Sequence, residues 1–355
     1  MAWWNRGRVR PALAGAAAGG SDGASAVPMA SADAAQERPE AVRRIAVFLQ
    51  NRARFGTLVC HIPLLNSLRR RFPSARLTVV ARFDAARMLV GPGLADALCA
   101  WPANRWAQFR TVRRLDADVL ITLRPASGFL DLLVGLSGAP IRLGFATAVG
   151  RRLFSAAPER DLATYRPLNY LRVVEALGVA PALSAHLEEL AGAAGPGLDP
   201  ALERYCLLPG GASPFKLWGI DNFLTLAVRL RATRPAARFV IVLGPDERLL
   251  RAAIDASPIA AVTDVLDAPS LGALAQAILA SRATIANDCG PSHVAQLLGV
   301  PYVGLFANHR CQAERVARQW FRPRPTARWI APPSGSPITA IRVEDVEARL
   351  REVIR

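Results

Sequence analysis

The residue types best suited to chemistry gather in the segment 283–301, near the carboxyl end of the sequence. The segment begins as a short apolar strand, Gly290 then permits a tight turn, and Pro291 suits the first position of a helix. A helix start presents unpaired N–H groups and a partial positive charge, so we expect a phosphate to bind there. His293 adds a side-chain donor in the first turn, and Asp288 can accept from sugar or ribose hydroxyls.

A second loop, 208–218, offers complementary chemistry earlier in the same half. Its two glycines permit an anion-cradling backbone, Ser213 offers a hydroxyl, and Lys216 supplies a compact positive charge. Lys216 is the only lysine in the chain, whereas arginines are dispersed throughout. The alternative interpretation makes Lys216 a solvated loop residue and Asp288 a simple helix cap. The presence of both loops favours a single site for a phosphate-bearing ligand.

The elements that must position these loops alternate between strands and helices. Short β-branched runs separated by helical patterns are typical of parallel sheets with helices on both faces. Strands are predicted at 45–50, 77–81, 118–123, 141–145, 206–208, 239–243, 261–265, 284–286 and 302–306. Helices are predicted at 58–72, 221–232, 246–255, 270–280, 291–298 and 343–355. The predicted fold class is therefore α/β, with two Rossmann-like domains facing a cleft.

Domain boundaries are expected where the composition changes. The Ala- and Gly-rich start lacks large apolar residues, which predicts a disordered tail. A Pro- and Gly-rich stretch at 180–200 indicates a boundary between the two domains. The expected order is a tail at 1–41, a first Rossmann-like domain at 42–185, a linker at 186–202, a second Rossmann-like domain at 203–335 and a closing helix at 336–355.

Composition narrows the classes of function. The formal net charge of +16, from 44 basic and 28 acidic residues, predicts anionic partners such as phosphates, acidic lipids or nucleic acid. Nucleic acid is disfavoured, because the arginines are dispersed and no recognition motif appears. The sequence also lacks a GxGxxG loop, a GxSxG elbow and any metal-ligand spacing. With five scattered cysteines and no apolar run of membrane-spanning length, we expect a cytoplasmic protein without a metal.

The first residues of the chain suggest one further partner. Two tryptophans and three arginines stand close together there, and such a pair of residue types suits an anionic membrane surface. These residues are Trp3, Trp4, Arg6, Arg8 and Arg10. An inert tail is the alternative interpretation.

Together, the two loops resemble the pattern of glycosyltransferase family 9, the bacterial heptosyltransferases of lipopolysaccharide core assembly. That family has a PGAS…K-W loop followed by a D-[ST]-G-P-x-H-[LIV]-A segment, and similar segments stand here at 209–218 and 288–295. The segments 56–65, 136–145 and 242–246 also match the family pattern. The resemblance covers most of the chain from residue 44 onward.

The resemblance implies a glycosyltransferase fold of the B type (GT-B) and inverting transfer without a metal or other cofactor. The implied donor is a nucleotide-sugar, an ADP-linked heptose or related sugar, and the implied acceptor is a lipopolysaccharide-core-type glycolipid held by the first domain. Such an enzyme would work in the cytoplasm, at the inner face of the cytoplasmic membrane. The implied donor-binding residues are Ser213 and Lys216 on the diphosphate, Asp288 on donor hydroxyls, and Gly290, Ser292 and His293 around the phosphates.

One position departs from the family pattern where catalysis needs it. Inverting transfer requires a base for the acceptor hydroxyl, and Thr57 stands where the family has its Asp. His61, one helical turn further on, is a candidate substitute, with a core histidine as the alternative; Asp84 and Asp131 are further candidates. The competing hypothesis is a nucleotide-sugar-binding homologue without transferase activity. The segment 307–310 also replaces the family's Gly-Pro-Thr-like turn.

Overall fold

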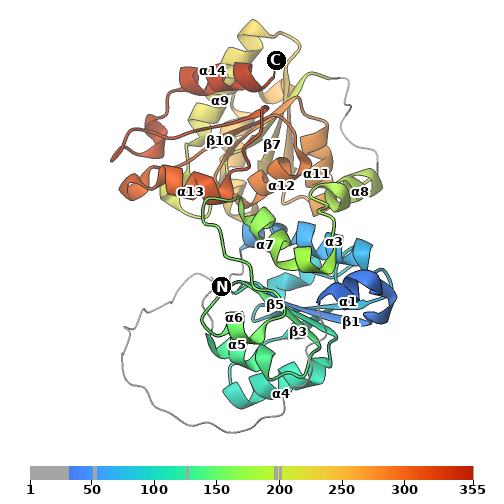
Figure 1. Ribbon diagram of the computed structural model, residues 1–355. Helices are drawn as coiled ribbons and strands as arrows, with labels where there is room; N and C mark the ends of the chain where they lie inside the picture. The colour runs from blue at the N-terminus through green and yellow to red at the C-terminus, as the bar shows by residue number, and fades with distance from the viewer. Residues whose placement is uncertain (1–31, 51–53, 125–127, 196–198, 200–201, 355) are drawn as a thin grey trace.

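The computed structural model describes residues 32–50, 54–124, 128–195, 199 and 202–354. Two lobes, each built on one parallel sheet, are stacked end to end (Figure 1). The N-terminal sheet has the order β3-β2-β1-β4-β5. Its strands are β1 (Arg44–Phe48), β2 (Arg76–Ala81), β3 (Ala97–Ala100), β4 (Val119–Thr122) and β5 (Ile141–Gly144).

The C-terminal sheet has the order β11-β10-β9-β6-β7-β8, also with every neighbouring pair parallel. Its strands are β6 (Arg204–Leu208), β7 (Arg238–Leu243), β8 (Thr263–Asp267), β9 (Ala283–Asn287), β10 (Tyr302–Leu305) and β11 (Ala327–Ile330). The predicted fold class, two Rossmann-like α/β lobes, is thus confirmed.

Helices connect the strands and cover the sheets (Figure 1). The N-terminal lobe has α1 (Ala32–Glu37), α2 (Phe55–Val59), α3 (Ile62–Arg71), α4 (Arg105–Leu115), α5 (Gly128–Gly135), α6 (Gly150–Leu153) and α7 (Arg166–Val174). Helix α8 (Ala185–Ala193) follows, and the C-terminal lobe has α9 (Ile220–Thr233), α10 (Arg251–Asp255), α11 (Leu271–Leu279), α12 (Gly290–Leu298), α13 (Ala313–Trp320) and α14 (Val343–Val353). Three short 3-10 helices matter below: η2 (Asp84–Leu89), η4 (Pro214–Lys216) and η5 (Pro245–Leu250).

All nine predicted strands overlap an observed one, but two edge strands were not predicted. Strands β3 and β11 are half-buried and carry no continuous β-branched run, so period and propensity give little signal there. The single helix predicted over 58–72 is divided into α2 and α3. Pro63 lies in the first turn of α3 and cannot donate a backbone hydrogen bond, which breaks the helix between Val59 and Ile62.

Two boundary predictions were wrong in part. The expected tail ends earlier than residue 41, because α1 places Ala35 in the core and Gln36 Nε2 donates to the carbonyl of Ala176 at 2.8 Å. Residues 1–31, with the two tryptophans and arginines discussed above, lie outside the described residues. The expected linker begins as a helix: α8 packs against α11, α12 and α3, and Leu187 is buried. Leu187 and Ala191 share one helical face, a signal that the neighbouring glycines obscured.

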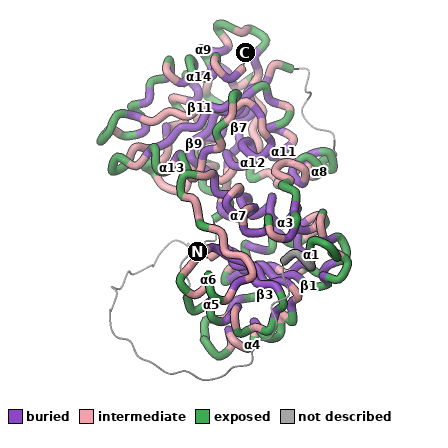
Figure 2. Tube along the Cα trace, viewed as in Figure 1, coloured by how far each residue is buried: buried purple, intermediate pink, exposed green. Residues whose placement is uncertain are grey.

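The two lobes are packed together, not merely tethered. Figure 2 shows buried chain running through both sheets and through α7 and α12 where the lobes meet. One apolar cluster includes Leu64 of α3, Val173 of α7, Leu187 of α8 and Leu297 of α12. The strand ends at the junction are therefore held at a defined distance from each other.

Candidate functional site

The sheet topology brings the two predicted loops together. Strand β6 lies between β7 and β9, with Leu208 opposite Ala286, so the loops that follow β6 and β9 leave neighbouring strands at the same edge. This reversal of strand order is the position where open α/β sheets bind ligands.

Lys216 and Asp288 form an ion pair across this crevice, Nζ to Oδ2. Lys216 ends η4 and its side chain is a quarter exposed, whereas Asp288 directly follows β9 and is 8% exposed. The charges of both act on the ring of His293. The structure therefore brings Lys216, Asp288 and His293 into one charged cluster, which we call the cradle.

Two polar side chains that sequence reasoning missed hold the cradle loops in place. Asn287 is fully buried; it donates to the Pro209 carbonyl at 2.6 Å and accepts from the Trp218 N–H at 3.3 Å. Glu247 of η5 accepts from the Gly211 N–H at 3.3 Å. A buried asparagine at a strand end was the available signal for the first, because such a side chain must be fully hydrogen-bonded.

The start of α12 forms one wall of the cradle. The Ser292 hydroxyl donates to the Cys289 carbonyl at 2.7 Å and so stabilises the turn. Gly290 and Pro291 remain partly exposed. Ser213, the N-cap of η4, is partly exposed, and its carbonyl accepts from the Lys216 N–H at 2.9 Å. The predicted roles of these residues in donor binding remain predictions.

His293 is enclosed by both lobes and is neutral at physiological pH. Its Nδ1 lies 3.3 Å from the Tyr165 hydroxyl and 3.5 Å from Gln296 Nε2. Both neighbours can donate, so we assign Nδ1 as the acceptor and the proton to Nε2. Burial, supported by the nearby charges of Lys216 and Arg166, lowers the pKa of His293 to about 4. The ring can therefore offer one neutral N–H donor at Nε2.

Two glycines make a close backbone contact between the lobes. A Cβ atom on Gly56 would lie 3.0 Å from the Cα of Gly290 and 3.0 Å from Cδ2 of His293. A Cβ atom on Gly290 would lie 2.6 Å from the ring of Phe55. No side chain fits at either position without movement, so the start of α2 rests directly on the start of α12.

The candidate bases on the N-terminal lobe do not all face this junction. Thr57 is buried in α2. His61 is fully buried and stacks on Tyr170 with ring centroids 4.8 Å apart. Burial lowers the pKa of His61 to about 4. This is the environment of a core histidine, which the sequence left open as the alternative.

The two aspartates have contrasting surroundings. Asp84 of η2 is exposed and forms a surface ion pair with Arg87. Asp131 of α5 is buried, accepts from the Thr147 hydroxyl at 2.7 Å, and burial raises its pKa. Asp131 is thus the only one of these two with the environment of a functional carboxyl group.

Further residues at the junction carried no sequence signal. Arg166, at the start of α7, donates to Gln50 at 3.0 Å and to Gln319 of α13 at 2.9 Å, and its guanidinium lies 4.2 Å from the ring centre of Trp320. Gln50 and Gln319 belong to different lobes, so Arg166 connects them. Within the part of the chain that the structure describes, no three His, Cys, Asp or Glu side chains gather as a metal site requires.

The segment after β10, where the sequence departs from the family, forms a short helical turn. Asn308 accepts from the Ala313 N–H at 3.3 Å and donates to the Pro332 carbonyl at 3.0 Å. The His309 ring lies 5.1 Å from that of Phe215, the neighbour of Lys216. This turn therefore contacts the same loop that carries the cradle lysine.

Two stacked parallel sheets with a charged cradle at their junction define the GT-B fold class. The structure is similar to heptosyltransferase WaaC of E. coli with ADP-2-deoxy-2-fluoro heptose, with a TM-score of 0.63 and 15% identity over 87% of this chain and 99% of that one. It is also similar to ADP-heptose lps heptosyltransferase II of E. coli, with a TM-score of 0.60 and 19% identity over 88% and 98%. A glycosyl transferase family 9 protein from Veillonella parvula has a TM-score of 0.62 and 19% identity over 88% and 97%.

The family comparison is more specific than the fold. Residues 179–318, which contain both cradle loops, match the model of glycosyltransferase family 9 (heptosyltransferase). The resemblance stated from the motifs is therefore confirmed over those residues. No curated protein matches the sequence.

Proposed function

We propose that the protein is an inverting glycosyltransferase that moves a heptose or related sugar from an ADP-linked or similar nucleotide donor to a lipopolysaccharide-core-type acceptor. The observation that carries this proposal is the cradle: the only lysine of the chain meets Asp288 beside the start of α12. Its elements lie at the strand-order reversal of a domain that matches the heptosyltransferase family.

In this proposal the cradle stabilises the leaving diphosphate. Sugar transfer leaves negative charge on the departing phosphate, and pre-positioned donors lower the barrier to that charge. Lys216 supplies a full positive charge, the α12 start supplies oriented N–H groups, and His293 supplies its Nε2–H. Without ligand, Asp288 holds Lys216 in place through the ion pair. When the diphosphate binds Lys216 instead, Asp288 accepts hydrogen bonds from donor hydroxyls. No metal or other cofactor is proposed.

Transfer requires a general base that takes the proton from the acceptor hydroxyl. The lack of an evident base is the reason for a second candidate function. Thr57 has no carboxylate, and His61 is buried and stacked, so neither is placed to take the proton. These observations favour the second candidate, a nucleotide-sugar-binding homologue that does not transfer. Asp131, buried with a raised pKa, is the remaining candidate for a base in the transferase proposal.

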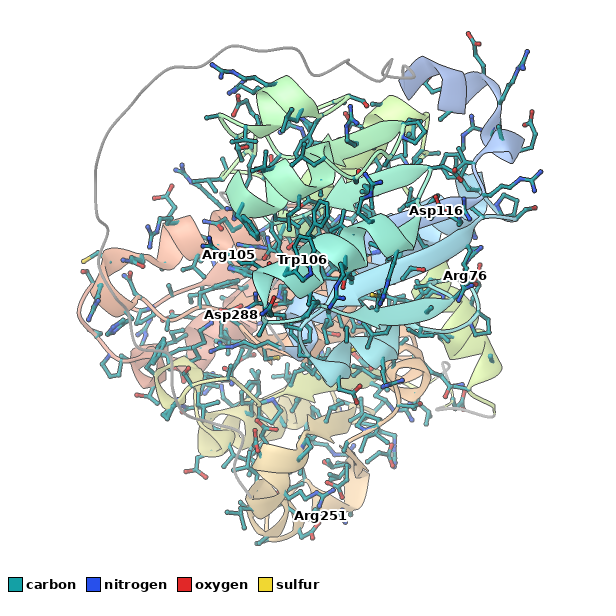
Figure 3. The ribbon with its side chains drawn as sticks, turned by 90° about the horizontal axis from the view of Figure 1, so that it is seen from below. Arg76, Arg105, Trp106, Asp116, Arg251 and Asp288 are labelled. Carbon is teal, nitrogen blue, oxygen red and sulfur yellow. The ribbon has the colours of Figure 1, made fainter. Side chains whose placement is uncertain are left out.

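The acceptor of such an enzyme is lipid-linked, and the N-terminal lobe has a surface suited to a membrane. Helix α4 lies at the end of the lobe farthest from the C-terminal lobe (Figure 1), and Figure 3 looks onto this end, with Arg105 and Trp106 labelled. Trp106 is 65% exposed, α5 exposes Phe129 and Leu132, and Leu136 directly after α5 is also exposed. Arg105 lies 4.8 Å from the ring centre of Phe129, which joins the two helices at this surface.

Positively charged side chains stand on the same helix as Trp106 and on α6, which packs against α5. The exposed arginines of α4 and α6 are Arg105, Arg110, Arg113, Arg114, Arg151 and Arg152. Exposed apolar groups on helices that also carry arginine favour the interface of an anionic bilayer. We propose peripheral contact at the inner face of the cytoplasmic membrane through this surface. Among the described helices, none has the length and apolar character to cross a bilayer.

Two assays test these proposals. Calorimetric titration with ADP, UDP, GDP and their sugars identifies the donor, and single-turnover reactions with that donor and a core glycolipid measure transfer. Transfer with inversion at the anomeric carbon supports the enzyme; donor binding without transfer or hydrolysis supports the second candidate. Absence of any nucleotide binding rejects both.

Sedimentation with vesicles tests the membrane surface. Binding to phosphatidylglycerol vesicles but not to phosphatidylcholine vesicles is expected, and the double variant Trp106→Ser, Leu132→Ser should weaken it by roughly tenfold. Leu249→Ser, at a lone apolar residue of the other lobe that is 91% exposed, is the matched control. Equal loss in both variants would reject this surface.

A further inference from the structure

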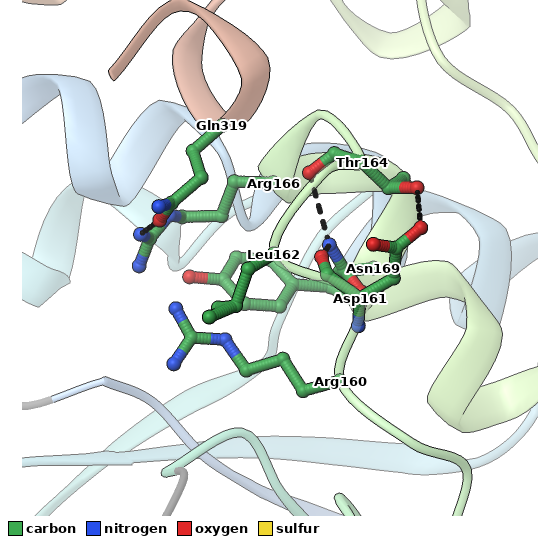
Figure 4. A pocket seen from close by; sticks show the side chains of 8 residues that line it. Arg160, Asp161, Leu162, Thr164, Arg166, Asn169 and Gln319 are labelled. Atoms are coloured by element: carbon green, nitrogen blue, oxygen red, sulfur yellow. Dashed lines mark hydrogen bonds between the residues drawn. The ribbon is translucent and has the colours of Figure 1, made fainter. Parts of the chain in front are cut away.

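A second polar pocket lies at the lobe junction, apart from the cradle (Figure 4). All but one of its lining residues come from the loop before α7 and from α7 itself; Gln319 comes from α13 of the other lobe. The lining residues are Arg160, Asp161, Leu162, Thr164, Arg166, Asn169, Tyr170 and Gln319.

The pocket contains hydrogen-bond donors that have no acceptor. The Tyr170 side chain is 1% exposed, and its hydroxyl proton has no acceptor among the described residues, because the neighbouring Arg166 side chain can only donate. The same holds for Nε of Arg166, a residue that is 9% exposed. Burial raises the pKa of Tyr170, so the phenol stays protonated and remains a donor. Buried donors of this kind are normally paired, and leaving them unpaired costs free energy.

The acceptors that line the same pocket are already engaged. The Asp161 carboxylate accepts from the Thr164 hydroxyl and from the Ala163 N–H. Asn169 Oδ1 accepts from the Asp161 N–H at 3.0 Å, and Gln319 Oε1 accepts from Arg166 at 2.9 Å. A ligand that fits must therefore bring acceptor atoms.

The charge of the pocket defines the ligand further. In Figure 4 the guanidinium ends of Arg160 and Arg166 lie on the same side of the pocket. Both charges act on the Tyr170 hydroxyl, which places that hydroxyl near both arginines. The enclosed space is small, with room for about one water-sized group, and it opens to solvent, so a ligand group that binds must do so at this opening. Arginine recognises carboxylate and phosphate oxygens with paired N–H groups.

We propose that this pocket binds one oxyanion group, a carboxylate or a phosphate, carried by the acceptor glycan. The acceptor as its source rests on the proposed transferase function; the anion site itself does not. Trp320 connects the two sites, because its ring lies 5.3 Å from that of His293 in the cradle and 4.2 Å from the guanidinium of Arg166. An acceptor anchored here by its charged group stands beside the donor.

The pocket is complete only when the lobes are together, since Gln319 comes from the C-terminal lobe and the remaining lining residues from the N-terminal lobe. A ligand that binds this pocket stabilises the arrangement in which the two lobes are packed together. If the donor binds the same arrangement, donor binding and anion binding favour each other by linkage. Acceptor charge would thus help to hold the lobes in the arrangement that transfer needs.

The test uses the Lys216→Ala protein, in which the cradle has lost its cation and the pocket is intact. Titration with inorganic phosphate tests the pocket for a phosphate group, and a separate titration with glucuronate tests it for a carboxylate. We expect saturable binding of at least one probe, weakened roughly tenfold by adding Tyr170→Phe, which keeps the ring stacked on His61. Arg160→Gln should weaken it similarly. Arg76→Gln, at an exposed arginine of the same lobe outside the pocket, is the charge-matched control and should change nothing.

Binding of only one probe supports the site and identifies the group it takes. No saturable binding of either probe, or equal affinity with and without the Tyr170 hydroxyl, overturns the proposal. In transfer assays on the full chain, Tyr170→Phe should raise the acceptor KM by roughly tenfold, and it should leave the donor Kd measured without acceptor unchanged. If the unsubstituted protein binds the anion but shows no transfer, the proposed function is rejected and the anion site is not.

Discussion

The two lobes share a sheet topology but differ in the chemistry at their strand ends. In the C-terminal lobe, the loops after β6 and β9 carry an ion pair, Lys216 with Asp288, that buried Asn287 holds in register. In the N-terminal lobe, α2 after β1 carries the buried Thr57, and the buried, stacked His61 follows at the start of α3. In the proposed function, donor recognition is assigned to the C-terminal lobe and proton transfer to the N-terminal lobe, and only the first of these two regions is built from charged groups.

The sharpest test of this contrast restores the missing charge. Thr57→Asp should raise the single-turnover transfer rate by roughly a hundredfold, because a general base contributes a factor of this order. Thr57→Asn, of similar size without a base, is the control and should give no increase. If neither variant changes the rate, while Asp131→Asn abolishes transfer, the base lies in α5 and the contrast between the lobes is weaker than we infer.

The next effect concerns the cradle. Lys216→Ala should weaken binding of the donor nucleotide by roughly thirtyfold, since a charge-assisted contact to a phosphate is lost. Calorimetry measures this directly. Arg251→Ala, which removes an exposed, ion-paired cation elsewhere in the same lobe, should leave the affinity unchanged. Undiminished affinity in Lys216→Ala would remove the lysine from the donor site.

A smaller effect is expected at the wall of the cradle. His293→Ala should weaken nucleotide affinity by roughly fivefold, because the neutral imidazole offers one uncharged hydrogen bond at Nε2. His309→Ala, at an imidazole on the neighbouring turn, is the comparison variant. Equal losses in both would show that the cradle depends on general packing around Lys216 and not on the Nε2–H donor.

The smallest effect is on stability against acid. His61 and His293 have pKa values of about 4 in the folded chain, below the ordinary 6.5, so the unfolded chain takes up protons first. The two histidines therefore cost no free energy of unfolding above about pH 6.5, and they lower it progressively as the pH drops towards 4. His61→Phe, which keeps the stack on Tyr170, should reduce the drop in Tm between about pH 7 and about pH 5 by a few degrees. An unchanged drop would show that His61 does not carry this pH dependence.

Sequence reasoning succeeded where the residues of one short segment determine its local structure. The turn at Gly290, the helix start at Pro291 and the rare lysine at 216 each have a local physical reason, and the alternation of strands and helices brought their loops to one sheet edge. Strands β3 and β11 were missed because half-buried edge strands have weak periodicity, and α8 was missed because Leu187 and Ala191 stand among glycines.

The lobe junction was beyond sequence reasoning for a different reason. Tyr165 and His293 are 128 positions apart, and Arg166 and Gln319 are 153 apart, yet each pair is in contact. No local pattern distinguishes an arginine that connects two lobes from the many that coat the surface. The packing between domains decides which of these residues meet, and it also decided that His61 belongs to the core.

The rarity of lysine gives the cradle a chemical handle. Lys216 carries the only side-chain primary amine in the chain. An aldehyde that bears a phosphate, such as pyridoxal phosphate, would be drawn to this amine by its own negative charge, and borohydride would then fix it as a secondary amine. Peptide mapping after Lys-specific proteolysis would find a single internal cleavage point, blocked by that adduct, so covalent occupancy could be followed in crude extracts while the natural sugar is still unidentified.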